Sequence, residues 1–527
     1  MQAPFSRTMF DLLAEQAAQC PTAPAVIATT GTTTFADLHG AAARVAGALH
    51  ARGIRRGDAV GLLVNNRVEW LEIFFGAAAL GAIVVPLSTW SKAPELDFLL
   101  ADSGIKCLFL LESFGGQNFA ADIAGLRATG RHPGLERVVL VGSPPRDGFE
   151  SFATYREAPP LAVLPPGEAA SAGDTLVVLY TSGSSNRPKS VPLRHFAAIE
   201  NGFNIGERQG LVPGDRVLIS IPLFWSYGAV NALPAALTHG ATLVLQSRFE
   251  PGEALDLIER HRCTALYTLP AMTNALVAHA NFAPARTASL RTGVTIGAPQ
   301  DVLKAAEVLG AARICNIYGS TETYGNCCVT PSDWPLQRRA QCQGPPLPGV
   351  EIRIRDADTR ALRPPITSAE ITIGEVEVRG YLMDGYRGDS ARHNVEVLTP
   401  DGWFCTGDLG HLDADGHFHF AGRSSEMIKR SGINVSPAEV EEALQQHASV
   451  GLAGVTGRPD ADKGEAIVAF VVPRPGMSIS ADDLVAHCRA RLSGYKVPDE
   501  IRLADALPLT PTGKLMRREL KALATTA

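Results

Sequence analysis

Four hydroxyl side chains crowd around a glycine and a lysine shortly before residue 190. The segment reads Thr181-Ser182-Gly183-Ser184-Ser185-Asn186-Arg187-Pro188-Lys189-Ser190, and an apolar run from Thr175 to Leu179, which predicts a buried strand, comes just before it. Backbone N–H groups, hydroxyl donors and a cation are the groups that bind a polyphosphate. The segment therefore predicts a site for a nucleoside triphosphate.

Two other readings of this segment stay open when it is taken alone. Loops rich in Ser and Gly are often only turns. The segment also nearly spells a P-loop, because four residues separate Gly183 from Pro188-Lys189-Ser190. The second glycine of that motif is replaced by Pro188, which has no N–H for a phosphate and cannot adopt a positive φ. This difference disfavours a P-loop NTPase.

Further segments along the chain decide between these readings. They are Asn316-Ile317-Tyr318-Gly319-Ser320-Thr321-Glu322-Thr323, Gly402-Trp403-Phe404-Cys405-Thr406-Gly407-Asp408-Leu409-Gly410, Gly422-Arg423 leading into 427–441, and Pro511-Thr512-Gly513-Lys514. With the first loop, they stand in the order and spacing of one family. The chain resembles the adenylate-forming superfamily of acyl-CoA synthetases, luciferases and nonribosomal adenylation domains, over nearly its full length.

Length and composition agree with this resemblance. A chain of 527 residues is too long for one compact core, so two or more domains are expected. A net charge of −6 argues against a general nucleic-acid binder. The apolar stretches are too short to span a bilayer, and residues 1–16 carry acidic residues and lack a signal-peptide core. The nine cysteines lack metal-ligand spacing, so we expect reduced thiols in a cytoplasmic protein.

Short apolar strands alternate with helical segments through the first 300 residues, which predicts parallel sheets covered on both faces. Between Val350 and Tyr386, polar and apolar residues alternate, which predicts half-exposed strands of a small barrel or an antiparallel sheet. After Arg423 a short α+β unit is expected, with strands at 450–455 and 466–472 and helices that begin at Pro437 and Ala481. The resemblance implies an α/β fold with two parallel subdomains and a small β-barrel in an N-terminal domain, 1–424, and a mobile C-terminal domain, 425–527.

The resemblance also implies a reaction and its nucleotide-binding residues. A carboxylate would attack the α-phosphate of ATP, and a thiol, usually that of CoA, would then displace AMP from the acyl-adenylate. Tyr318 would stack on adenine, Asp408 and Arg423 would contact the ribose, and Gly319 would complete the adenylate site. The adenine pocket would be lined by Gly297, Ala298 and Pro299, and the phosphates would be held by Thr181, Ser182, Gly183, Ser184, Ser185 and Lys189, with family glycines replaced by Asn186 and Ser190.

Catalysis is implied to depend on three residues. Thr321 would donate to the α-phosphate, and Glu322 would coordinate Mg²⁺, which takes few protein carboxylates together with phosphate oxygens. Lys514 would enter the site in one orientation of the C-terminal domain and bridge the carboxylate and the phosphate, where charge develops. The hinge would lie at Ser425, where the family mostly has Asp or Lys.

The second half-reaction is implied to use the segment from Lys429 to Gly432. Gly432 would let the pantetheine arm pass close to the backbone, because it lacks a Cβ. Lys429 and Arg430 would meet CoA phosphates, although a solvated basic face explains these two residues nearly as well. The segment, which includes Ser431, resembles that of CoA ligases more than that of amino-acid adenylation domains.

The acyl pocket carries the weakest signal. Trp225 stands where many family members have His, and the segment around it resembles that of benzoate-type CoA ligases. Candidate walls are Trp225, Tyr227, Gly228, Ala229, Gly297 and Thr323. None of these residues is basic, and residues 222–229 contain no Asp for an amino group, so we expect a hydrophobic monocarboxylate: aromatic, alicyclic or medium-chain.

Three hypotheses follow. The first is an ATP-dependent acyl- or aryl-CoA ligase that uses Mg²⁺, which we favour. The second is an adenylating enzyme that loads the acid onto an acyl carrier protein. The third is a nucleotide-binding protein without transferase activity. The presence of Lys514, Glu322 and Asp408 argues against this third hypothesis. A homodimer is compatible with each of them, and no nucleic-acid or membrane partner is expected.

Overall fold

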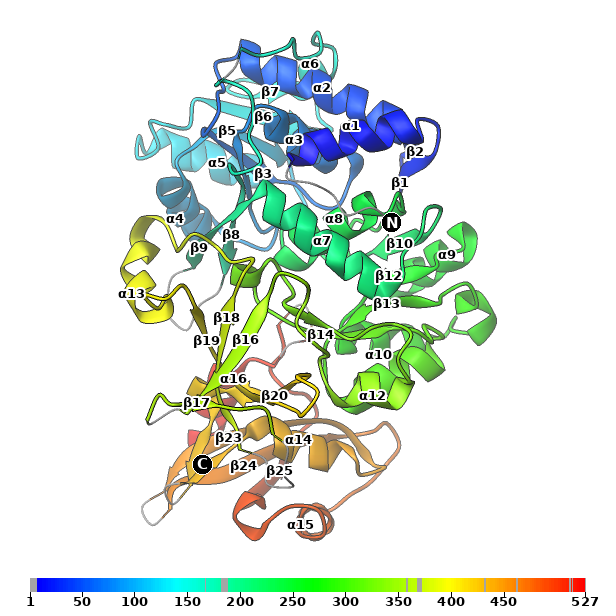
Figure 1. Ribbon diagram of the computed structural model, residues 1–527, viewed down its shortest axis with the longest axis vertical. Helices are drawn as coiled ribbons and strands as arrows, with labels where there is room; N and C mark the ends of the chain where they lie inside the picture. The colour runs from blue at the N-terminus through cyan, green and yellow to red at the C-terminus, as the bar shows by residue number, and fades with distance from the viewer. Residues whose placement is uncertain are drawn as a thin grey trace.

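A computed structural model describes residues 7–165, 167–181, 188–356, 359–366, 372–430, 433–460, 463–510, 513 and 515–526. Two large sheets with their helices form the upper part of the molecule, a smaller antiparallel sheet lies below them, and a compact α+β unit occupies the opposite end (Figure 1). No helix in the described part of the chain is long and apolar enough to cross a bilayer.

The first large sheet has seven strands, and its neighbouring strands are parallel except for the last pair. In spatial order the strands are β7 (Glu150–Ser151), β6 (Arg137–Val141), β5 (Ile105–Leu111), β3 (Ala59–Leu63), β4 (Ile83–Pro86), β8 (Thr175–Thr181) and β9 (Lys189–Arg194). Its helices are α2 (Phe35–Ala51), α3 (Val68–Ala79), α4 (Ala93–Ser103), α5 (Phe119–Ala128) and α6 (Ala153–Arg156). This parallel α/β architecture was predicted from the alternation of apolar strands and helical segments.

The second large sheet has eight strands, which are parallel except at its two ends. In spatial order they are β15 (Cys328–Val329), β14 (Cys315–Tyr318), β13 (Thr292–Thr295), β12 (Ala265–Tyr267), β10 (Arg216–Ile219), β11 (Thr242–Leu245), β1 (Pro24–Ala28) and β2 (Gly31–Thr34). Its helices are α7 (His195–Gln209), α8 (Leu233–Thr238), α9 (Pro251–His261), α10 (Pro270–Ala278), α11 (Pro299–Leu303) and α12 (Leu336–Gln341). Helix α1 (Met9–Gln19) packs mainly against α2 and α3. A π-helical turn, η1 (Tyr227–Ala232), leads into α8, and short turns lie at 284–287, 304–308 and 321–323.

Helix α7 connects the two large sheets at the centre of the molecule (Figure 1). It begins directly after β9, and Gly210 ends it with a left-handed φ of 66°. The buried amide of Asn201 donates to the backbone carbonyls of Tyr324 and Asn326, at 3.3 and 2.9 Å. These bonds fix the segment that follows β14 against α7. Helix α7 therefore holds the end of β9 in one sheet and the end of β14 in the other.

The third sheet is antiparallel, with the order β17 (Leu362–Arg363), β16 (Glu351–Arg355), β18 (Gly374–Arg379), β19 (Phe404–Leu412) and β20 (Phe418–Arg423). A turn at 388–393 and α13 (Asn394–Val397) connect β18 to β19. The half-exposed alternation between Val350 and Tyr386 predicted β16 and β18, whereas β19 and β20 lie beyond that range. The expected closed barrel is wrong for the described residues, because β17 and β20 are edge strands that do not pair with each other.

The C-terminal unit has a sheet of its own with helices packed on both faces. Its strands are β21 (Ile428–Arg430), β22 (Ile433–Val435), β23 (Val450–Asp460), β24 (Gly464–Pro473) and β25 (Glu500–Leu503), and its helices are α14 (Pro437–Gln445), α15 (Ala481–Arg489) and α16 (Arg517–Thr525). Short turns lie at 424–426 and 494–496. The α+β pattern after Arg423 is confirmed, and the domain boundary at 424/425 stays a prediction.

Candidate active site

The predicted phosphate-binding segment lies between two paired strands. Strand β8 ends at Thr181 and β9 begins at Lys189, and these two residues are partners in the antiparallel ladder. Ser182, Gly183, Ser184 and Ser185 lie outside the described residues, as does Asn186. The residues that flank them, Thr181 and Lys189, belong to the last pair of strands of the seven-stranded sheet.

Ser190, one of the two residues that replace family glycines, has a clear structural role. Its side chain is buried, and its hydroxyl donates to the backbone carbonyl of Arg387 at 2.7 Å and accepts from the Arg387 N–H at 3.1 Å. A glycine could make neither bond. The hydroxyl therefore ties β9 to the connection between β18 and β19.

Tyr386, next to Arg387, connects two of the predicted site residues. The ammonium group of Lys189 lies 5.0 Å from the centre of the Tyr386 ring, and the Tyr386 hydroxyl donates to Glu322 Oε1 at 2.7 Å. Burial, with the neighbouring Glu322 charge, raises the pKa of Tyr386 above its ordinary value, so this hydroxyl stays protonated. Tyr386 was not predicted, since no motif in the sequence marks it.

Tyr318, Asp408 and Arg423 form a second cluster. The Tyr318 hydroxyl donates to Asp408 Oδ2 at 2.8 Å, and Arg423 Nε lies 3.1 Å from Asp408 Oδ1. Asp408 and Arg423 are also partners in the β19–β20 ladder. Three residues from distant parts of the sequence, each expected to contact the adenosine of ATP, are thus brought into contact. The Tyr318 ring packs against Phe418, with ring centres 4.4 Å apart.

Three buried polar atoms near these residues have no hydrogen-bond partner in the described part of the chain. They are Thr295 Oγ1, Gln300 Nε2 and Ser320 Oγ. Thr295 ends β13, and the predicted adenine-pocket segment, Gly297 to Pro299, follows it into α11. Burying such groups unpaired is costly, so their presence at the ends of β13 and β14 and in α11 fits a polar ligand that contacts them.

Thr321 connects the nucleotide residues to a neighbouring cavity. Its hydroxyl donates to the hydroxyl of Ser226 at 3.1 Å, and Ser226 directly follows Trp225. Thr323 instead caps its own turn, because its hydroxyl accepts from the Ser320 N–H at 3.0 Å. Throughout, "nucleotide side" means Lys189, Tyr318, Thr321, Glu322, Tyr386, Asp408 and Arg423.

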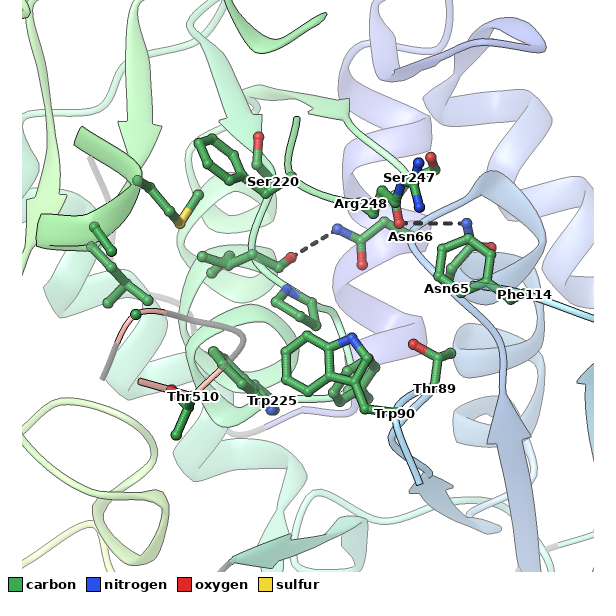
Figure 2. Close-up of a pocket in the computed structure, with 18 of the residues that line it drawn as sticks. Asn65, Asn66, Thr89, Trp90, Phe114, Ser220, Trp225, Ser247, Arg248 and Thr510 are labelled. Atoms are coloured by element: carbon green, nitrogen blue, oxygen red, sulfur yellow. Dashed lines mark hydrogen bonds between the residues drawn. The ribbon is translucent and has the colours of Figure 1, made fainter. Parts of the chain in front are cut away.

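The neighbouring cavity has a volume of about 300 Å³ and is called the aromatic cavity here. Figure 2 shows Trp90 and Trp225 close to Thr510 at one end, and Asn65, Ser247 and Arg248 gathered at the other. The lining residues are Asn65, Asn66, Thr89, Trp90, Phe114, Ser220, Ile221, Pro222, Phe224, Trp225, Ser247, Arg248, Phe249, Leu269, Ala271, Met272, Leu509, Thr510 and Gly513. The cavity is therefore apolar along most of its wall and polar at one end.

An edge-to-face cluster of rings forms the aromatic end. Trp90 meets Phe224 and Trp225 with ring centres 5.2 Å apart in both pairs, at angles of 87° and 80°. Of the predicted pocket walls, Trp225 lines this cavity. Tyr227, Gly228 and Ala229 lie just behind it, where Tyr227 donates to the Val294 carbonyl at 3.0 Å and a Cβ on Gly228 would come within 2.6 Å of the Pro222 carbonyl.

Sequence reasoning missed most of the aromatic cavity. Trp90, Phe114 and Asn65 come from loops after three separate strands, and no sequence motif marks these residues. The polar end also differs from the predicted set of uncharged walls, since the exposed Arg248 lies at it. One signal was available: Asn65, Trp90 and Arg248 all follow the carboxyl ends of parallel strands, where ligands of open α/β sheets bind.

The C-terminal loop reaches this cavity. Leu509, Thr510 and Gly513 line it, and Gly513, with a φ of +78°, lies so close to Ala271 that a Cβ at this position would overlap the Ala271 side chain. Only glycine fits this close approach. Lys514, the next residue, lies outside the described residues, as do Ser431 and Gly432.

The remaining predicted residues lie in the C-terminal unit and at its start. Arg430 is already engaged, because its guanidinium bonds Asp499 Oδ1 at 2.7 Å and the Val497 carbonyl at 3.0 Å. Lys429 is exposed, and its backbone N–H donates to Glu465. Ser425 lies in the short turn between β20 and β21. Of the two basic residues expected near CoA, Lys429 is therefore the accessible one.

Known proteins resemble this chain along its length. The family model of AMP-binding enzymes matches residues 13–387, and that of the AMP-binding enzyme C-terminal domain matches 439–514. The chain is 34% identical to a feruloyl-CoA synthase of an Amycolatopsis species (93% of each chain) and 34% identical to the indoleacetate–CoA ligase of Aromatoleum aromaticum (93% and 92%). The crystal structure of the anthranilate CoA ligase AuaEII with anthranoyl-AMP superposes with a TM-score of 0.88 at 29% identity, covering 99% of both chains.

Proposed function

The chain belongs to the AMP-binding enzyme family, and we propose that it joins a hydrophobic carboxylic acid to the thiol of CoA at the expense of ATP. One observation carries the proposal. The loop that leads to Lys514 lies in the aromatic cavity, and Thr321 of the nucleotide side bonds to the neighbour of a cavity residue, Trp225. A carboxylate bound in the cavity would thus lie between the nucleotide and the lysine.

In the first half-reaction, a carboxylate oxygen forms a bond to the α-phosphorus of ATP while the bond to the β-phosphate oxygen breaks. The products are an acyl-adenylate and pyrophosphate. Tyr318, Asp408 and Arg423 would hold the adenosine, and Thr321 would donate to the α-phosphate. Lys189, at the edge of the sheet, would hold the leaving pyrophosphate, because its ammonium group is fixed above the Tyr386 ring.

Glu322 fits a role as the magnesium ligand. It is a buried carboxylate whose Oε1 accepts from Tyr386, while its Oε2 accepts no hydrogen bond from a described residue. One carboxylate with phosphate oxygens and water is the usual protein environment of Mg²⁺. The ion would neutralise phosphate charge, and Tyr386 would keep the Glu322 carboxylate in place.

Lys514 would supply the positive charge for adenylation. Charge accumulates on the carboxylate and phosphate oxygens as the new bond forms, and a cation held at that point lowers the barrier. The contact of Gly513 with Ala271 supports a position of the loop against the N-terminal domain in this state. Rotation about Ser425 would then withdraw the loop.

In the second half-reaction, the sulfur of CoA attacks the acyl carbon and AMP leaves with its bonding electrons on the phosphate oxygen. The segment from Lys429 to Gly432 would face the site in that state. We assign Lys429 to the CoA phosphates, because Arg430 is held by Asp499.

The cavity favours an acid with an aromatic or other flat apolar body. Its rings offer edges and faces at contact distance, and such contacts contribute about 0.5–1.5 kcal/mol per ring pair beyond area burial. The relatives named for feruloyl, indoleacetate and anthranilate substrates support an aryl acid. Alicyclic and medium-chain acids are the alternatives, and both are included in the panel of acids below.

The test is pyrophosphate release from ATP and Mg²⁺ across a panel of carboxylic acids, with and without CoA, scored for AMP and thioester. Selective turnover of aryl acids that yields a CoA thioester is expected. If acyl-AMP formed without a CoA thioester, the acceptor would instead be the thiol of a carrier protein. Absence of pyrophosphate release with every acid would refute it.

A further inference from the structure

A second cavity, called the basic groove here, shares no lining residue with the aromatic cavity. It has a volume of about 450 Å³ and lies between the last turns of α7, the segment 331–333 after β15, and Pro348. Two guanidinium groups line it, those of Arg208 and Arg313. No step of the proposed reaction uses this groove.

Arg208 is a half-buried cation that no carboxylate of the described chain meets at ion-pair distance. Its guanidinium makes no hydrogen bond and no ion pair with any residue that the structure describes. Burial lowers its pKa from the ordinary value, so the charge is held in an unfavourable environment. A buried guanidinium is normally paired, as Arg291 is: it forms an ion pair with Asp215 and donates to the Gly210 carbonyl at 2.9 Å. A desolvated, unpaired charge is costly and often marks a functional site.

Arg313 adds a second cation from the opposite side. Within the described chain, its guanidinium makes two long hydrogen bonds to Ser332, from Nε to the carbonyl at 3.4 Å and from Nη2 to the hydroxyl at 3.3 Å. No carboxylate in the described chain lies within ion-pair distance of it. Two planar guanidiniums and a hydroxyl therefore meet across one groove.

The groove also contains two carboxylates, which must be weighed against the cations. Glu207 is exposed, and its Oε1 lies 3.1 Å from Nε2 of His239. Asp333 is exposed as well, and its charge acts on Arg208 across the groove without forming an ion pair. Solvent therefore screens both carboxylates, whereas the guanidinium of Arg208 is half-buried.

We propose that the basic groove binds a small phosphate monoester, separately from the nucleotide side. Arginine pairs carry the planar donor geometry that matches phosphate oxygens, and the two positive charges match the nearly double negative charge of a monoester. The volume exceeds what a bare phosphate fills, and Phe203 with Pro331 offers apolar surface for the rest of the molecule.

Isothermal titration of phenyl phosphate into the full-length protein tests this proposal. Saturating ATP without acid or CoA keeps the nucleotide side occupied. We expect one binding event in the wild type, about tenfold weaker in Arg208→Gln and in Arg313→Gln, since each removes a charge-assisted bond. Asp333→Asn should instead tighten binding several-fold, because it removes a like charge. Arg338→Gln is the control: Arg338 pairs with Asp415 on the β19–β20 hairpin.

Opposite effects of the arginine and aspartate variants would support the proposal even if one variant folds poorly. A parallel titration with phenol reports binding by the ring alone, and one with inorganic phosphate reports binding by the charge alone. No heat from phenyl phosphate in the wild type would overturn the proposal. So would unchanged affinity in Arg208→Gln, or weaker binding in Asp333→Asn.

Discussion

On the nucleotide side, Tyr318, Asp408 and Arg423 contact one another at 2.8 and 3.1 Å, whereas in the aromatic cavity Ser220 Oγ and Asn65 Oδ1 are buried without partners in the described chain. Most of the nucleotide residues lie in short sequence motifs, although the contacts between them join motifs far apart in the chain. The cavity residues come from loops after several separate strands and from the C-terminal loop.

Under the proposed function, the difference follows from what each region would recognise. ATP would be used with every acid, so one polar arrangement with internal hydrogen bonds would serve all of them. The acid differs between relatives, and an apolar cavity built from loops changes shape without disturbing the sheets. A change on the nucleotide side should therefore alter ATP use with every acid, and a change in the cavity should alter the choice of acid alone.

The largest effect is expected from Lys514→Ala. Acyl-adenylate formation should fall by about 10²–10³-fold, because one preorganised charge is lost from the transition state. Thioester formation from supplied acyl-AMP should stay within a few-fold of the wild type. Rapid-quench assays of each half-reaction measure this, with Lys521→Ala on α16 as a control lysine. An equal loss in both half-reactions would contradict the two-orientation mechanism.

Asp408→Asn should raise KM for ATP by about 10- to 100-fold, because hydrogen bonds to a charged group contribute about 1.5–3 kcal/mol each. The variant loses its ion pair with Arg423. Steady-state kinetics at saturating acid measure the change. Asp415→Asn on the same hairpin is the control and should behave like the wild type. A normal KM for ATP in Asp408→Asn would remove this residue from the nucleotide side.

Acid should weaken the scaffold that both regions share. His195 begins α7 and accepts a hydrogen bond from the Met9 N–H, and burial lowers its pKa to about 4. An unfolded His titrates near pH 6.5, so below that pH the unfolded chain binds more protons and stability falls until about pH 4. From pH 6.5 to 4.5 the free energy of unfolding should drop by about 2 kcal/mol through this group.

Denaturant unfolding of His195→Asn at the two pH values checks this. Asn can still accept a hydrogen bond from the Met9 N–H, but it does not titrate. The part of the decrease in the free energy of unfolding that His195 causes should therefore be absent in this variant. A pH dependence identical to that of the wild type would show that His195 is not the group responsible.

Trp225→Ala should shift the ratio of kcat/KM between an aryl and an aliphatic acid by about tenfold, because apolar pocket contacts discriminate by about 1–3 kcal/mol. The ring stands in an edge-to-face contact with Trp90, 5.2 Å away. Competition between benzoate and octanoate, read as the two CoA thioesters, measures the ratio. If the ratio of kcat/KM between the two acids did not change, Trp225 would not take part in selecting the acid.

The smallest effect is expected from Ser190→Ala. The variant loses both hydrogen bonds to the Arg387 backbone, which should cost about 1–2 kcal/mol of stability. Equilibrium unfolding in urea measures the loss. We expect the acid preference to stay unchanged, since Ser190 does not line the aromatic cavity. A stability equal to that of the wild type would mean that the Arg387 loop detaches readily.

Sequence reasoning predicted what short segments encode. The parallel sheets followed from apolar runs, and the third sheet followed from residues that alternate along β16 and β18. Tyr318 and Asp408 are 90 residues apart in the sequence. Only the resemblance of their motifs to one family predicted that both lie in the same site. Trp90 and Tyr386 could not be predicted, because their roles depend on loops that only the folded sheets bring together. The closed barrel failed for a similar reason, since strand alternation does not say whether edge strands meet.

The most direct test of the division between the two regions crosses the variants with the substrates. KM for ATP and the aryl-to-aliphatic ratio of kcat/KM would be measured for the wild type, Asp408→Asn and Trp225→Ala, each with benzoate and octanoate. We predict that Asp408→Asn changes KM for ATP alone and that Trp225→Ala changes the acid ratio alone. If either variant changed both quantities to a similar extent, the two regions would form one recognition unit, contrary to this account.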